Sequence, residues 1–106
     1  MPDQVRASHI LLMYKGSMRS SASRSKDEAR SQITTLKSEL DGGADFAALA
    51  KANSDCPSKV EGGDLGEFGK GQMVKEFETT AFGLAVGATS GVIETPFGYH
   101  IIRRTA

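Results

Sequence analysis

A glycine-rich stretch from Glu61 to Met73 constrains the fold of this chain more than any other segment. Its repeated glycines exclude a continuous helix and allow tight turns or a close approach of the backbone to another group. The large apolar side chains of Leu65, Phe68 and Met73 stand between these glycines, and Phe77 follows shortly after. They have few sequence neighbours that could bury them. We therefore interpret the stretch as the rim and floor of an apolar pocket that the rest of the chain supports.

Length and charge narrow the possible classes of protein. The 106 residues predict a single domain, residues 1–106, with a modest core. Basic and acidic side chains number 13 each, and this balance argues against nucleic acid as a partner. No apolar run reaches membrane-spanning length and no signal peptide is visible, so we expect no membrane partner and a cytoplasmic protein. The single cysteine, Cys56, excludes an internal disulfide and fits a reducing compartment.

The hydrophobic pattern predicts an α+β fold. Strands are expected at residues 5–13, 90–94 and 99–104, with a hairpin turn at 95–98 between the last two. The first strand is mostly apolar on both faces, so helices or loops should cover each side. The element order, which is strand, helices, strand, helix and strand pair, suggests that the first and last strands are central neighbours in the sheet.

Helices are expected in the regions between these strands. Ser25 and Glu28 form a capping-box pattern at the start of a helix that Gly42-Gly43 ends. Further helices are expected at residues 45–53 and 74–82, with a short helical turn at 58–60.

The two histidines and the cysteine leave three interpretations open. If the first and last strands pair, His9 and His100 can meet in the core, and Cys56 stands at a helix end leading into the glycine-rich stretch. A zinc site is one interpretation, although the close paired spacings of zinc motifs are missing. A thiol hydrolase is the second, because cysteine and histidine form the pair that such enzymes use. The third is that both histidines are core residues, hydrogen-bonded to each other and to a hydroxyl such as Thr95.

Several short motifs occur together in a specific order. They are Ala7-Ser8-His9-Ile10-Leu11-Leu12, Phe46-Ala47-Ala48-Leu49-Ala50, Ser54-Asp55-Cys56, Gly62-Gly63-Asp64-Leu65-Gly66-Glu67-Phe68, Gly71-Gln72-Met73, Phe77 and Phe97-Gly98-Tyr99-His100-Ile101-Ile102. From Val5 to Thr105 the sequence closely resembles the parvulin family of peptidyl-prolyl cis/trans isomerases. This resemblance implies a four-stranded antiparallel sheet surrounded by about four helices, with the active site on the concave side of the sheet.

The resemblance also implies roles for individual residues. Leu65, Met73 and Phe77 correspond to the pocket that grips the substrate proline, with Phe68 on its wall. The remaining positions implied for the site are the paired histidines His9 and His100, the hydroxyl of Thr95 bonded to them, the active-site Cys56 and Asp55 before it.

Rotation about an Xaa-Pro amide bond requires no metal, cofactor or covalent step. We expect proline-containing polypeptides to be the substrates, the histidine pair to order the floor of the site, and Cys56 to line the path of the rotating carbonyl. The alternative function is a non-catalytic binding module of the same fold, acting as a chaperone or adaptor, and a thiol hydrolase ranks third. With no amphipathic helix left over for self-association, we expect a monomer.

The loop after the first strand departs from the pattern of the phosphate-directed members. Those members carry a lysine and two adjacent arginines there. Here Arg19 matches the second arginine, whereas Met18 and Met13 occupy the other two positions and Lys15 lies nearby. Fewer charged donors weaken the recognition of a phosphate. We therefore expect Lys15 and Arg19 to favour an acidic residue before proline without strict dependence on phosphate.

Overall fold

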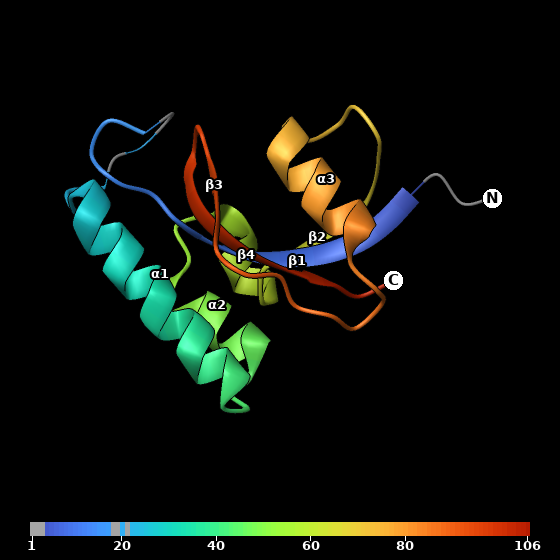
Figure 1. Ribbon diagram of the computed structural model, residues 1–106, viewed down its shortest axis with the longest axis horizontal. Coiled ribbons are helices and arrows are strands. Elements are labelled where there is room, and N and C mark those ends of the chain that lie inside the picture. The colour runs from blue at the N-terminus through green and yellow to red at the C-terminus, as the bar shows by residue number, and fades with distance from the viewer. Residues whose placement is uncertain (1–3, 18–19, 21) are drawn as a thin grey trace.

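The computed structural model describes residues 4–17, 20 and 22–106. This part of the chain forms one antiparallel sheet of four strands with three α-helices and one 3-10 helix (Figure 1). In chain order the elements are β1 (Gln4–Leu12), α1 (Lys26–Asp41), α2 (Phe46–Asn53), η1 (Pro57–Glu61), β2 (Asp64–Gly69), α3 (Lys75–Gly83), β3 (Ile93–Thr95) and β4 (Gly98–Arg104). The α+β fold predicted from the sequence is confirmed, with the 3-10 helix as the fourth helical element.

The first and last strands lie at the centre of the sheet, as the sequence predicts. The strand order is β2-β1-β4-β3, and β1 pairs with β4 from Ala7↔Arg104 to Leu12↔Tyr99. Both strands are buried along most of their length, which explains why neither shows the alternation of polar and apolar residues typical of a half-exposed strand.

Helices cover both faces of these central strands. Figure 1 shows α1 and α2 on one side of the sheet and α3 on the other. Because side chains alternate across a strand, Ile10, Leu12 and Ile101 pack with α1 and α2, whereas Ala7 and Ile102 pack with α3. His9 and His100 share the parity of Ala7 and Ile102. The two histidines are therefore on the α3 face.

The capping box predicted for α1 is present. The Ser25 hydroxyl accepts a hydrogen bond from the Glu28 N–H at 3.1 Å, and the Glu28 carboxylate accepts one from the Ser25 N–H at 2.9 Å. The helix ends where Gly42 donates its N–H to the Ser38 and Glu39 carbonyls, as expected from the glycine pair. These local signals fix the entry and exit of the longest helix.

One strand prediction was wrong in extent. The expected element order places a strand, without stated bounds, between the second and third helices, and β2 lies there, in agreement with the four strands implied by the family resemblance. At the other edge β3 runs from Ile93 to Thr95 and not over residues 90–94. Ser90 contacts β4 outside this strand: its N–H donates to the Ile102 carbonyl at 2.7 Å, and its hydroxyl, in place of a backbone carbonyl, accepts the Ile102 N–H at 2.9 Å. The turn between β3 and β4 is correspondingly confined to Pro96 and Phe97.

One glycine is required where β2 approaches β1. Gly63 has φ +88°, and a Cβ there would lie 2.3 Å from the His9 carbonyl oxygen. The glycine carbonyl accepts a hydrogen bond from the His9 N–H at 2.9 Å. The backbone of the glycine-rich stretch is therefore pressed against the strand that carries the first histidine.

None of the helices in the described residues combines the length and apolar character needed to cross a membrane.

Candidate active site

A cavity of about 640 Å³ opens on the α3 face of the sheet. Its floor comes from β1 and β4, and its walls come from the segment after α2, the glycine-rich stretch, α3 and the β3–β4 turn. The lining residues are His9, Leu11, Met13, Asp55, Cys56, Pro57, Leu65, Gln72, Met73, Val74, Phe77, Phe97 and His100. The fold thus gathers most of the predicted site around one hollow, from segments far apart in sequence.

The two histidines touch each other at the floor of this cavity. Their Nδ1 atoms lie 3.1 Å apart, and His100 Nε2 lies 2.7 Å from the Thr95 hydroxyl. This hydroxyl also accepts the Phe97 N–H at 3.2 Å, which ties the β3–β4 turn to the pair. The contact arises because Leu11, not His9, stands opposite His100 in the β1–β4 register, so the imidazoles meet diagonally on the same face.

Burial keeps both imidazoles neutral at pH 7. It lowers the pKa of His9 to about 4, and burial together with the charge of His9 lowers the pKa of His100 to about 3. Two neutral rings joined through their Nδ1 atoms share one proton in that hydrogen bond. If the Thr95 hydroxyl donates to His100 Nε2, then His100 Nδ1–H donates to His9 Nδ1, and His9 carries its proton on Nε2. If His100 Nε2–H instead donates to Thr95, then His9 Nδ1–H donates to His100 Nδ1, and His9 Nε2 carries no proton.

The apolar walls include the predicted proline pocket. Leu65, Met73 and Phe77 all line the cavity, and the Phe77 ring stands edge-on to both imidazoles, with centroid distances of 5.5 Å to His9 and 5.6 Å to His100. Phe68 does not line the cavity: it is buried behind Phe77, with ring centroids 5.8 Å apart. Its expected place on the wall is therefore corrected to a supporting position, because its side chain faces the core between β2 and α3.

Cys56 lines the cavity without pairing to a histidine. Both nitrogens of His100 are engaged by His9 and Thr95, and His9 Nε2 is buried with no hydrogen-bond partner among the described residues. The thiol–imidazole hydrogen bond on which a thiol hydrolase depends is thus missing from the described contacts.

A metal centre finds no support in the described residues. They contain no group of three or more histidine, cysteine, aspartate or glutamate side chains placed to hold an ion.

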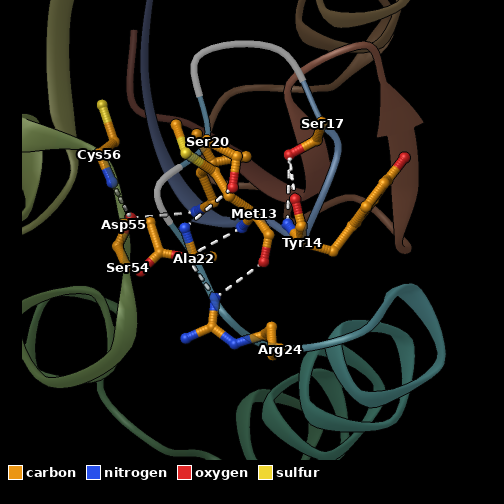
Figure 2. Close-up of polar contacts among 10 residues, drawn as sticks. Met13, Tyr14, Ser17, Ser20, Ala22, Arg24, Ser54, Asp55 and Cys56 are labelled. Carbon is orange, nitrogen blue, oxygen red and sulfur yellow. Dashed lines mark hydrogen bonds and ion pairs between the residues drawn. The ribbon is translucent and has the colours of Figure 1, made fainter.

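Sequence reasoning missed Arg24 near Asp55. The Arg24 guanidinium forms an ion pair with the Asp55 carboxylate and donates to the Met13 carbonyl at 2.9 Å (Figure 2). In the sequence Arg24 is only one of three cations in a polar loop, and nothing local links it to an acid 31 positions away. It also missed six lining residues of the cavity, which are Leu11, Met13, Pro57, Gln72, Val74 and Phe97.

The predicted basic site is only partly described. Lys15 is exposed on the turn after β1 and does not line the cavity. Arg19 lies outside the described residues.

Comparison with known proteins agrees with this arrangement. The family model described as "PPIC-type PPIase domain" matches residues 1–106. The chain is 44% identical to the peptidyl-prolyl cis-trans isomerase Pin1 of Digitalis lanata, over 97% of each protein. It is 50% identical to the foldase protein PrsA of Geobacillus sp. (strain WCH70), over 96% of this chain and 32% of that protein.

A solved structure gives the same result. The peptidyl-prolyl isomerase ESS1 from Candida albicans matches with a TM-score of 0.92 at 41% identity, over 98% of this chain and 63% of that one. The chain therefore belongs to the PPIC-type peptidyl-prolyl isomerase family, the parvulins.

Proposed function

We propose that this peptidyl-prolyl cis–trans isomerase binds the substrate proline ring between Leu65, Met73 and Phe77, above the His9–His100 pair. The observation that carries the proposal is the apolar cavity that closes over two neutral, mutually bonded histidines. A site with this lining offers no charged nucleophile at its floor. It offers instead an apolar cavity above an uncharged floor.

Such an environment suits rotation about an amide bond. Resonance holds the bond planar with a barrier of about 18–20 kcal/mol. At the twisted transition state the nitrogen lone pair is no longer conjugated, and the carbonyl loses its dipolar resonance form. A pocket that grips the proline ring, excludes water and fits the twisted geometry binds that state more tightly than either planar form.

In this mechanism the polar residues have supporting roles. The His9–His100–Thr95 chain fixes the floor and the adjoining turn, since each hydrogen bond restricts one ring or hydroxyl. Cys56, half-buried at the opposite wall, lies beside the path of the rotating carbonyl and forms no covalent bond with the substrate.

We further propose that the enzyme prefers an acidic residue before proline. Met13 lines the cavity and Lys15 is exposed two residues further along the chain, so we infer that the Lys15 ammonium can reach a substrate residue that precedes proline. An exposed ammonium attracts a carboxylate as well as a phosphate but lacks the forked geometry of an arginine cluster. The expected preference is therefore moderate and does not require phosphorylation.

We also propose an oligomeric state and a compartment: the protein is a monomer and acts in the cytoplasm. Among the described residues, Val60 and Val86 are the large apolar side chains that stand out as exposed, and two valines do not form an interface of the area that stable dimers bury. The single, free cysteine fits a reducing compartment.

NMR exchange spectroscopy on short peptides tests the function directly. We expect exchange cross-peaks between cis and trans forms of Ala-Pro, Glu-Pro and phosphoserine-Pro peptides only when catalytic amounts of protein are present, with the acidic peptides turned over faster. Lys15→Gln should reduce the acidic advantage, whereas the matched control Lys51→Gln on α2 should not. Resonance shifts at the pocket without any exchange would instead identify a binding module. Equal rates for all three peptides would remove the acid preference.

A further inference from the structure

Strand β1 extends beyond the point where its neighbour β2 begins. The β1–β2 register stops at Ser8↔Asp64, followed by the hydrogen bond from His9 N–H to the Gly63 carbonyl. On this edge the backbone groups of alternate residues, Leu11 and Met13, point away from β4. Buried or half-buried amides need partners, and no strand supplies them here.

The segment after α2 supplies these partners. Leu11 donates its N–H to the Ser54 hydroxyl at 3.0 Å, and its carbonyl accepts the Asp55 N–H at 2.7 Å. Met13 donates its N–H to Asp55 Oδ2 at 2.9 Å, and its carbonyl accepts from Arg24 Nη1 at 2.9 Å. Side-chain and backbone groups outside the sheet thus take the place of a second neighbouring strand along the edge that β2 leaves open. Figure 2 shows the bonds of Met13 to Asp55 and Arg24 as dashed lines.

Arg24 closes this network. The same Nη1 that donates to Met13 also pairs with Asp55 Oδ2, so one guanidinium holds the strand end and the carboxylate together. The backbone carbonyl of Arg24 accepts the Lys15 N–H at 2.8 Å, which fixes the arginine at the base of the loop. The two side chains are only 24% and 27% exposed, so the ion pair is less screened by water than an ordinary surface pair.

The network ends at the catalytic cavity. Met13, Asp55 and Cys56 line it, and the Cys56 N–H donates to the Ser54 hydroxyl at 3.3 Å. Arg24 is not among the lining residues and does not reach the substrate. Any effect of Arg24 on the reaction therefore passes through the residues that it holds.

We propose that Arg24 is a positioning residue for isomerisation. By bonding Asp55 and the Met13 carbonyl together, it fixes the wall that presents Cys56 and Met13 to the rotating amide. The role rests on the isomerase activity and is independent of the acid preference proposed above. A lysine can pair with Asp55, but its ammonium is a strongly hydrated point charge on a flexible stem, so it holds the Met13 carbonyl and the Asp55 carboxylate less firmly and fills the role only in part.

Steady-state NMR exchange with an Ala-Pro peptide provides the test, because this substrate does not involve the acid preference. Turnover by the unaltered protein is checked first, since its absence would count against the isomerase function itself. Arg24→Gln should then lower kcat about tenfold while KM stays within about threefold, as expected for a displaced wall in a formed pocket. Arg24→Lys should recover part of the loss. Arg30→Gln, an exposed arginine on α1, is the matched control and should leave both constants unchanged.

A double-mutant cycle with Asp55→Asn completes the test. If Arg24 acts through Asp55, the double variant should be no slower than the slower single variant. If the losses of kcat in the two single variants instead multiply in the double variant, the proposal is wrong. It is also wrong if Arg24→Gln has the same kcat as Arg30→Gln, or if Arg24→Gln lowers only the melting temperature and leaves kcat unchanged. If Arg24→Gln does not fold, the same cycle with Arg24→Lys gives the decision.

Discussion

At the scale of single residues, the two histidines determine how this molecule responds to acid. His9 and His100 are buried, bonded to each other, and have pKa values of about 4 and about 3 against an ordinary value of 6.5. They are the only histidines in the chain. Between pH 6.5 and pH 4 the unfolded chain consequently binds protons that the folded protein does not.

The first prediction concerns this difference. Because the folded pKa values are depressed, stability falls as pH drops below 6.5, by about 2 kcal/mol per histidine at pH 5. Urea unfolding at pH 7 and pH 5 measures the loss. The carboxylates with lowered pKa values, among them Asp64 and Glu94, titrate mainly below this window. Imidazole resonances that stay constant from pH 8 to pH 5 are the matching control. An imidazole of the folded protein that titrates near pH 6.5, or equal stability at both pH values, would contradict the prediction.

The second prediction concerns Cys56. Because the thiol has no histidine partner among the described contacts, we expect Cys56→Ser to retain most of the activity. Cys56→Asp should lose nearly all of it, because a carboxylate there would add an unpaired charge to the cavity wall, unlike Asp55, which is paired with Arg24. Exchange spectroscopy on an Ala-Pro peptide measures both. A covalent adduct trapped during turnover would exclude the non-covalent role.

At the scale of elements, the approach of β2 to β1 depends on a position without a side chain. Gly63 lies against the His9 backbone with positive φ, whereas Gly91 in the loop before β3 has open space and an ordinary φ. The two glycines look equivalent in the sequence. Their surroundings make them different.

The third prediction contrasts these two glycines. Gly63→Ala should destabilise the fold by about 3 kcal/mol or more, because it adds left-handed strain to a backbone clash. Gly91→Ala should change stability by less than about 1 kcal/mol. Chemical denaturation followed by circular dichroism measures both. Similar stabilities for the two variants would show that β2 can move away from β1 without cost.

The elements also show why sequence reasoning succeeded in some places and failed in others. The helix α1 was predicted because its capping box and apolar stripe are local signals. The bounds of β2 could not be predicted because its glycines resemble a loop and because its pairing partner β1 lies far earlier in the sequence. Arg24 was missed for the same reason, since its partner is distant and an ion pair leaves no periodic trace. The histidine pair and the apolar side chains that line the cavity could be predicted because rare residue types and ordered motifs single them out.

At the scale of the whole molecule, two apolar layers share the same central strands. The layer under α1 and α2 contains Ile33 and Ile101, and the layer under α3 contains Phe77 and Ile102. The radius of gyration, 12.9 Å, is that of a compact domain of this length. Because β1 and β4 contribute to both layers, we expect the two layers to unfold together.

The fourth prediction follows from this sharing. Ile33→Ala should cost about 3 kcal/mol, because it opens a cavity at a fully buried site, and the whole fold should lose stability together. Far-UV circular dichroism reports all elements, while tyrosine fluorescence reports the α1 layer, where both tyrosines lie. We expect coincident transitions for the two signals. The exposed neighbour Thr34→Ala should change stability by less than about 0.5 kcal/mol. Separate midpoints would show that the layers unfold independently.

The pairing of β1 with β4 brings the outer ends of these strands together. Arg6 donates its N–H to the Ala106 carbonyl at 3.1 Å, and its carbonyl accepts the Thr105 N–H at 2.8 Å. A polypeptide that enters the domain beside Arg6 leaves it beside Thr105. We therefore expect the domain to tolerate insertion into a loop of an unrelated host, or circular permutation with a short linker and new termini at Gly42-Gly43, with the sheet intact.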